Sequence, residues 1–123
     1  MAKAVGVGGI FLKARDPQTL SDWYARHLGI ARQNGGPLAF DGPESVGMTV
    51  FAHFPLDSKY FGQGEQQSLV NFRVDDLDQL LTDLARSGVR IDPKRDDSDY
   101  GRFAWIWDAE GNRVELWQPP AAE

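Results

Sequence analysis

Cysteine is absent from this chain of 123 residues, and histidine occurs only as His27 and His53. The first absence excludes disulfides, a thiol nucleophile and every thiolate metal site, and the second excludes a three-histidine centre within one chain. Basic residues are also few, since 13 lysines and arginines against 18 acidic residues give a net charge of −5. Phosphate binding needs concentrated positive charge, and these basic residues are scattered, so we expect no nucleic-acid partner.

Long apolar runs are missing too. No stretch approaches the roughly 18 apolar residues of a membrane span, and the start of the chain has no apolar run followed by a cleavage site. We therefore expect a cytoplasmic protein with no membrane partner.

The length lies near the mode for one domain, so 1–123 is interpreted as a single domain.

Aromatic residues, in contrast, gather near one end. Three of the four tryptophans, Trp105, Trp107 and Trp117, fall within a short C-terminal stretch. This concentration needs an explanation in terms of fold or function.

Two segments have the apolar spacing of helices. Asp16-Pro17 is typical of an N-cap with proline in the first turn, and Gly29 is typical of a stop; Asp76 and Gly88 bracket the second segment in the same way. The apolar stripes are Leu20, Trp23, Tyr24 and Leu28 in the first helix, and Leu77, Leu80, Leu81 and Leu84 in the second.

Short extended segments flank each helix, and the order of one strand, one helix and several strands occurs twice along the chain. The two N-caps, Asp16 and Asp76, are 76 − 16 = 60 residues apart. Residues 108–112, Asp-Ala-Glu-Gly-Asn, are a hairpin signal. The expected strands are 7–14, 37–40 and 46–54 in the first copy, and 69–74, 90–94, 102–107 and 113–118 in the second, with 55–67 as the connection.

The duplication and three motifs resemble a known family, over residues 7–118. The motifs are LKARDPQTLSDWYARHLGI, FRVDDLDQLLTDLARSGV and GRFAWIWDAEGNRVELWQP. A duplicated βαβββ module is the signature of the vicinal oxygen chelate superfamily, which includes glyoxalase I, extradiol dioxygenases and bleomycin-binding proteins. The resemblance implies an α+β fold in which two tandem βαβββ modules, about 5–54 and 68–118, form a curved eight-stranded mixed sheet around a concave site. It also implies a homodimer, and exposed edge strands give a physical motive for one.

The resemblance also implies where a divalent metal would bind. The three usual ligand positions match Gly9, Leu69 and Glu115, and a fourth falls near the apolar Val50. One carboxylate cannot hold a divalent ion at useful affinity. We therefore expect the usual metal site to be largely lost, with Glu115 as a metal ligand and a divalent metal as cofactor only in the alternative interpretation.

Strand alternation separates a uniformly apolar set of side chains, expected beneath the helices, from a mixed set, expected on the face that holds the site in this superfamily. Ile10, for example, belongs to the apolar set of its strand. An aromatic pocket with a few polar groups is typical of a small-molecule site, although the same rings would also serve simply to fill the sheet. The expected ligand-contacting residues are Phe11, Lys13, His53, Asn71, Arg73, Tyr100, Arg102, Phe103, Trp105 and Trp117, and the expected catalytic residue is Glu115.

Several of these residues have more than one interpretation. Glu115 is an ion-pair partner of Arg73, a catalytic or ligand-orienting group, or a metal ligand. Arg73 suits an anionic or carbonyl group of a ligand. His53 is either structural or an acid–base group at the cavity mouth. The acidic stretch 96–99, which precedes Tyr100, is interpreted either as a mobile rim that closes over a ligand or as a solvated loop tip.

Three functions remain open from the sequence. The leading hypothesis is a glyoxalase/bleomycin-resistance-like protein that binds a small aromatic molecule by stacking on Trp105 and Trp117. The second is an enzyme of the same superfamily, a lyase, isomerase or dioxygenase that uses a divalent metal or Glu115 as base. The third is a structural or regulatory dimer with a collapsed cavity.

Overall fold

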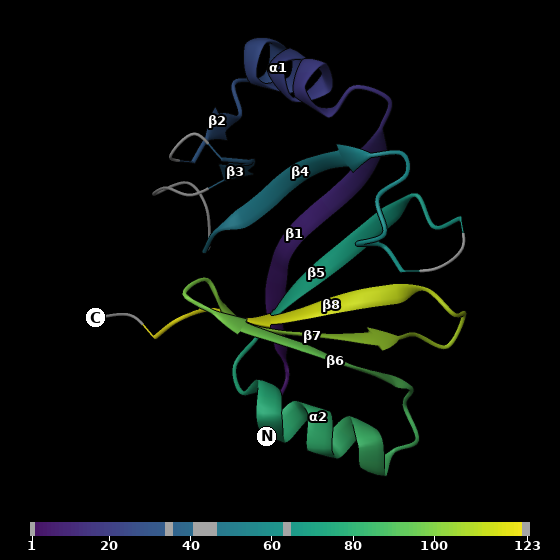
Figure 1. Cartoon of the computed structure of the whole chain (residues 1–123). Helices are drawn as coiled ribbons and strands as arrows, with labels where there is room; N and C mark the ends of the chain where they lie inside the picture. The colour runs from purple at the N-terminus through teal and green to yellow at the C-terminus, as the bar shows by residue number, and fades with distance from the viewer. Residues whose placement is uncertain (1, 34–35, 41–46, 63–64, 122–123) are drawn as a thin grey trace. The chain divides into compact units, whose positions relative to one another are not determined.

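The computed structural model describes the chain except for residues 1, 34–35, 41–46, 63–64 and 122–123. The chain divides into two compact units (Figure 1). The first unit is Gly8–Val70, and the second is Met1–Val7 together with Asn71–Glu123. Strands β1 (Ala4–Ala14) and β5 (Ser68–Val74) each contribute to both units.

The two units have the same topology. In the first, the strands lie in the order β2-β3-β4-β1, and in the second the order is β6-β7-β8-β5. The pairs β1–β4 and β5–β8 are parallel, whereas β2–β3, β3–β4, β6–β7 and β7–β8 are antiparallel. The predicted α+β fold with two βαβββ modules is therefore confirmed. The remaining elements are α1 (Pro17–Leu28), β2 (Ala31–Arg32), β3 (Leu38–Phe40), β4 (Thr49–Pro55), α2 (Leu77–Arg86), β6 (Ile91–Ser98), β7 (Gly101–Trp107) and β8 (Arg113–Gln118).

The local signals for helix ends and for the hairpin are confirmed. The Asp16 carboxylate accepts a hydrogen bond from the Thr19 backbone N–H at 3.1 Å, and α1 ends where Gly29 adopts a φ of 70°. Asp76 caps α2 in the same way. In the β7–β8 turn, Asp108 accepts from the backbone N–H groups of residues 110 and 112. Each of these signals works through bonds between near neighbours, so it survives any tertiary context.

Some expected boundaries were wrong. Strand β2, with two residues, was not predicted, and Val46 lies outside the described residues. Residues 96–98 belong to β6, where Asp96 pairs with Phe103, and not to a mobile rim. Backbone pairing with β7 here overrides the low strand propensity of aspartate.

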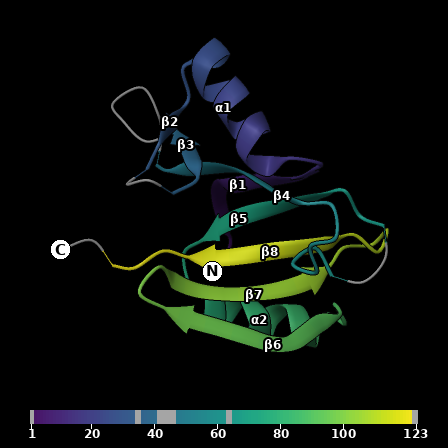
Figure 2. The same ribbon diagram turned by 45° about the horizontal axis from the view of Figure 1, so that its top comes forward.

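Helix α2 covers one face of the strands in the second unit, as Figure 2 shows where it lies behind β7 and β6. The buried residues Val74, Leu77, Ala104 and Leu116 form the core between them. These strand residues belong to the apolar sets predicted from alternation. The opposite face of β5, β7 and β8 carries the mixed sets, and we call it the mixed face; its residues are Asn71, Arg73, Phe103, Trp105, Trp107, Arg113, Glu115 and Trp117.

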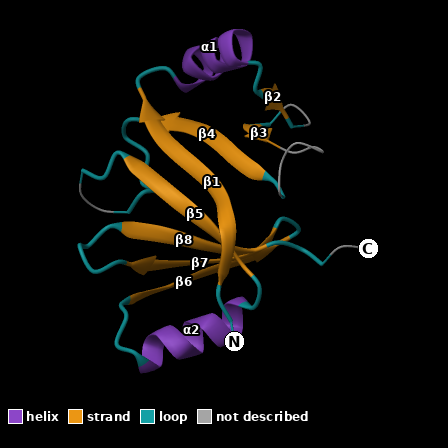
Figure 3. Cartoon of the chain, turned by 180° about the vertical axis from the view of Figure 1, so that it is seen from behind, coloured by secondary structure: helices purple, strands orange, loops and turns teal. Residues whose placement is uncertain are grey.

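In the first unit, β4 lies beside β1 (Figure 3) and presents different groups on its two faces. Phe51 and His53 contact Tyr24 of α1, whereas Val50, Ala52 and Phe54 pack with Phe11, Phe61 and Leu69. Ile10, which was expected beneath a helix, is 41% exposed. Within the described part of the chain, no helix is long and apolar enough to cross a membrane.

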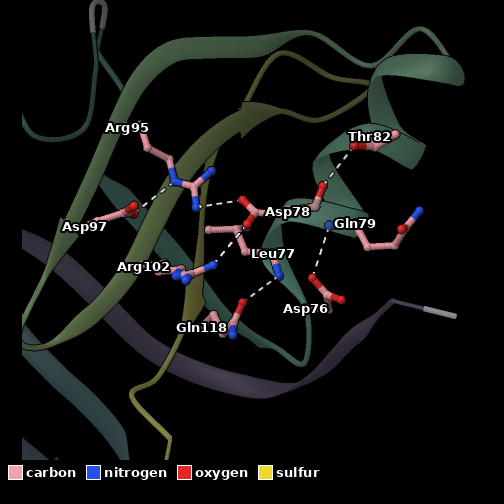
Figure 4. A network of polar contacts seen from close by, with 9 residues as sticks. All are labelled: Asp76, Leu77, Asp78, Gln79, Thr82, Arg95, Asp97, Arg102 and Gln118. Atoms are coloured by element: carbon pink, nitrogen blue, oxygen red, sulfur yellow. Dashed lines mark hydrogen bonds and ion pairs between the residues drawn. The ribbon is translucent and has the colours of Figure 1, made fainter.

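The start of α2 is tied to three strands by a polar network (Figure 4). Asp78 accepts hydrogen bonds from Arg95 at 2.9 Å and from Arg102 at 3.0 Å, and the Gln118 side-chain oxygen accepts from the Leu77 backbone N–H at 2.8 Å. Arg102 was expected to contact a ligand. The structure places it on the helix face instead, because its side chain alternates with that of Phe103.

Replacing Asp78 tests this network. We expect Asp78→Asn to lower the free energy of unfolding by about 1 kcal/mol, because two ion pairs are lost at a partly exposed site. Chemical denaturation measures the change, and the exposed Asp57→Asn serves as the matched control. The loss should shrink in 1 M salt, where the Debye length is about 3 Å. An equal loss at both salt concentrations would contradict an ionic origin.

Candidate functional site

The mixed face of the second unit is organised in rows that cross neighbouring strands. The strand register places Asn71 opposite Glu115 and Trp105 opposite Glu115, so these three form one row, the polar row. Trp117 lies two residues further along β8, opposite Arg73 of β5 and Phe103 of β7. We call these three residues the aromatic row, after its two rings. Two residues along a strand correspond to about 6.7 Å, so the rows are neighbours.

The centre of the polar row is a fully buried carboxylate. Glu115 is 0% exposed, Trp105 1% and Asn71 2%. The Asn71 amide nitrogen donates to Glu115 Oε1 at 2.5 Å, and the Trp105 indole nitrogen donates to Oε2 at 2.9 Å. Each oxygen of the Glu115 carboxyl group therefore accepts a hydrogen bond from an N–H donor.

Arg73, which the sequence suggested as a partner of Glu115 or of a ligand, has another contact. Its Nη1 donates to the Val7 carbonyl at 2.8 Å, at the start of β1. Gly6 leaves room for this arrangement, because a Cβ at that position would collide with the guanidinium. Arg73 thus helps to hold β1 against β5 within the second unit.

The aromatic row presents two parallel rings. The rings of Phe103 and Trp117 have centroids 6.1 Å apart and planes only 9° from parallel, and both side chains are half-buried. They lie on the face opposite α2, as the alternation predicted. The stacked, half-buried pair lies next to the buried polar row.

Backbone geometry fixes the position of Trp117. Its indole nitrogen donates to the Tyr100 carbonyl at 2.8 Å, in the turn between β6 and β7. The next residue, Gly101, has a φ of 121°, and a Cβ there would lie 2.8 Å from the same indole nitrogen. Only glycine fits this combination of backbone angle and close approach. The Tyr100 residue itself is 78% exposed.

Trp105 is less available than the sequence suggested. Beyond its near-complete burial, the Lys94 ammonium lies 5.1 Å and the Arg113 guanidinium 5.0 Å from its ring centroid. Such cation–π contacts cover the ring, so the expected stacking of a ligand on Trp105 is replaced by a structural role.

No pattern in the sequence predicts these cation–π contacts. Arg90 lies 3.7 Å from the Trp107 ring centroid, and the register shift in β6 between Ile91 and Arg95 is not encoded in a simple pattern. Arg113 is also held by Asp92 at 2.7 Å. The Lys94 backbone N–H, followed by the Arg113 guanidinium, lowers the pKa of Asp92, which keeps this pair ionic.

In the first unit, Gly9 and Leu69 occupy the two positions that match metal ligands, and apolar side chains surround both. Leu69 is buried against Phe11 and Phe61, with the Lys13 ammonium 5.2 Å from the Phe61 ring centroid. At Gly9, a Cβ would lie 2.7 Å from the Phe11 ring, so that ring occupies the space of a side chain.

The donor set therefore does not fit a divalent metal. Both oxygens of Glu115 already accept hydrogen bonds, and Gly9 and Leu69 supply no ligand atom. Among the described residues, no three histidine, aspartate or glutamate side chains are grouped as metal ligands.

His53 lies away from the Phe11 cluster, against α1. Its Nδ1 is 2.9 Å from the Ser21 hydroxyl, and its ring stacks on Tyr24 at 5.4 Å. Its Nε2 is buried without a hydrogen-bond partner among the described residues. Burial lowers the pKa of His53. Of the two interpretations of His53, these contacts favour the structural one, in which the side chain attaches α1 to β4.

The hydrogen bond from Trp105 to Glu115 predicts that replacing Trp105 destabilises the fold more than replacing Trp107 does. We expect Trp105→Phe to lower the free energy of unfolding by about 3 kcal/mol, because it removes a donor to a buried carboxylate and leaves a void. Trp107→Phe, on the same strand and half-buried, should cost less. Denaturation of both variants in the wild-type and Glu115→Gln backgrounds gives the coupling. A cost for Trp105→Phe that is unchanged beside Glu115→Gln would contradict the charge-assisted bond.

The lowered pKa of His53 predicts acid sensitivity. In the unfolded chain this histidine takes up a proton near pH 6.5, whereas the folded chain resists protonation to lower pH. The unfolded state therefore binds more protons below about pH 6.5, and stability falls as the pH drops. The thermal midpoint of His53→Asn, whose amide mimics the Nδ1 side of the ring, should fall less between pH 7 and pH 5. His27→Asn, at an exposed site, should behave as wild type; equal slopes for all three proteins would contradict the assignment.

Comparison with known proteins supplies the family. No curated protein matches the sequence. Methylmalonyl-CoA epimerase from Mycobacterium tuberculosis aligns with a TM-score of 0.70 at 22% identity, covering 96% of this chain and 90% of that one. The Streptomyces coelicolor epimerase in complex with 2-nitronate-propionyl-CoA aligns with a TM-score of 0.73 at 17% identity, covering 97% and 100%. These similarities show a shared fold. The profile of the Glyoxalase/Bleomycin resistance protein/Dioxygenase superfamily matches residues 6–116, and the chain belongs to that superfamily.

Proposed function

We propose that the chain binds a small planar aromatic molecule on the mixed face of its second unit, without a divalent metal. The observation that carries the proposal is the pair of parallel, half-buried rings of Phe103 and Trp117 on the face opposite α2. Flat aromatic surfaces favour offset stacking with other aromatic groups. The site is therefore suited to holding a ring system.

The anchoring of Trp117 supports a binding role over simple filling of the sheet. Its indole nitrogen is satisfied by the Tyr100 carbonyl, so the polar edge of the ring is paired while its plane is fixed. A ring held in one orientation loses little conformational freedom when a ligand stacks on it. A purely structural dimer with a collapsed cavity does not need this arrangement.

Enzyme activity has weaker support. A general base must be within reach of the proton it takes, and Glu115 is 0% exposed and covered by Asn71 and Trp105, which hydrogen-bond to it. The structurally similar epimerases act on methylmalonyl-CoA by their names, but identities of 17 to 22% carry the fold alone. The metal-dependent alternative lacks ligands at Gly9 and Leu69.

The test is a titration of ¹⁵N-labelled protein with 2-naphthol, 2-methoxynaphthalene and 2-naphthylamine, followed through the four indole N–H resonances. We expect Trp117 to shift on binding and the exposed Trp23 to stay unchanged. Trp117→Ala should weaken binding about tenfold or more, because the stacking partner is lost.

Two controls complete the experiment. Trp23→Ala should bind as wild type does, and a chelator should leave the affinity unchanged. Failure of every probe to bind would refute the proposal. Binding that disappears with chelator and returns with added metal would favour the metal-dependent enzyme.

A further inference from the structure

The buried amide of Asn71 has one satisfied end and one unsatisfied end. Its nitrogen donates to Glu115, and its oxygen, Oδ1, has no hydrogen-bond partner among the described residues. The side chain is almost completely buried. A buried acceptor without a donor is destabilising, and native structures contain few of them.

The orientation of this amide is set by its neighbour. The Asn71 nitrogen faces Glu115 Oε1, to which it donates, so the amide oxygen points away from that atom. Glu115 is held in turn by the Trp105 indole on its other side. The Asn71 oxygen is thus a pre-oriented acceptor, fixed by two hydrogen bonds along the polar row.

The two rows place Asn71 next to the residues of the aromatic row. Asn71 precedes Arg73 on β5 by two residues, and Glu115 precedes Trp117 by two on β8. This spacing of about 6.7 Å is close to the length of a fused two-ring aromatic system. A bicyclic ligand on Phe103 and Trp117 can therefore direct a substituent toward the polar row.

We propose that Asn71 selects ligands that carry an O–H or N–H donor on the aromatic ring, and that this donor binds Asn71 Oδ1. The inference rests on the proposed function and adds the chemical class of the ligand. The adjacent carboxylate has both oxygens engaged, so the new hydrogen bond goes to the amide oxygen. A ligand in which a methyl group replaces the donor hydrogen leaves that oxygen unpaired and adds bulk beside it.

The experiment compares 2-naphthol with 2-methoxynaphthalene, which differ by one methyl group on the same oxygen. In wild-type protein we expect 2-naphthol to bind about tenfold tighter, the value of one hydrogen bond that satisfies a buried acceptor. The side-chain amide resonances of Asn71 should shift with 2-naphthol and much less with the methyl ether. Equal affinities would overturn this inference and leave the stacking proposal intact, whereas absence of binding by both would overturn both.

Variants assign the preference to Asn71. Asn71→Leu, of similar shape, should bind the two compounds with equal affinity. Asn71→Ser, whose hydroxyl replaces the donor to Glu115 without a carbonyl, serves if the leucine variant does not fold, and it should also lose the preference. A tenfold preference that persists in either folded variant would overturn the assignment. Trp23→Ala is the control in which the preference stays at the wild-type ratio.

Discussion

The Glu115 carboxylate is buried in β8, and the second unit is arranged around its need for hydrogen-bond donors. An ionised group removed from water costs several kcal/mol unless it is well paired. The two neighbouring strands supply these donors. Strand β5 runs parallel to β8 and places Asn71 opposite Glu115, and β7 runs antiparallel and places Trp105 there. The position of β8 between β5 and β7 is therefore required by chemistry as well as by topology.

That constraint separates two ends of the mixed face. On one side of the polar row, Arg113, Asp92 and Trp107 form a packed arrangement of a cation, a carboxylate and an indole. On the other side, Phe103 and Trp117 are half-buried and parallel. The polar row thus lies between a region closed by its own side chains and a region of two half-buried rings. A buried carboxyl group with a donor on each oxygen also favours one register over others, since a slip of one residue would remove both donors.

The features that were predictable from the sequence are those that depend on near neighbours or on strict alternation. The caps at Asp16 and Asp76 and the turn at Asp108 are local, and alternation correctly separated the α2-facing residues from the mixed face. Arg102 was misassigned because it was treated with its neighbours in sequence rather than by its face, where Asp78 binds it. Strand β2 was missed because two residues carry no periodic signal.

The composition of the candidate site was predictable, but its pairings were not. Asn71, Trp105, Glu115 and Trp117 were expected on one face, yet Arg73 contacts the Val7 carbonyl, and Trp105 is covered by cations. Partners of long side chains depend on rotamers and on segments distant in the chain, which no spacing rule reports. His53 shows the same limit, since the Ser21 hydroxyl that binds it lies 32 residues away.

The hydrogen bond from Trp117 to Tyr100 has a consequence for how this superfamily member can diverge. The acceptor is a main-chain carbonyl, so the side chain at position 100 can change without releasing the indole. Gly101 has no such freedom. Two adjacent positions in one turn thus differ in their tolerance of substitution. Position 101 must remain glycine to keep the indole in place, whereas position 100 is open to other side chains. Substitutions can therefore accumulate at position 100 while the position of the indole stays the same.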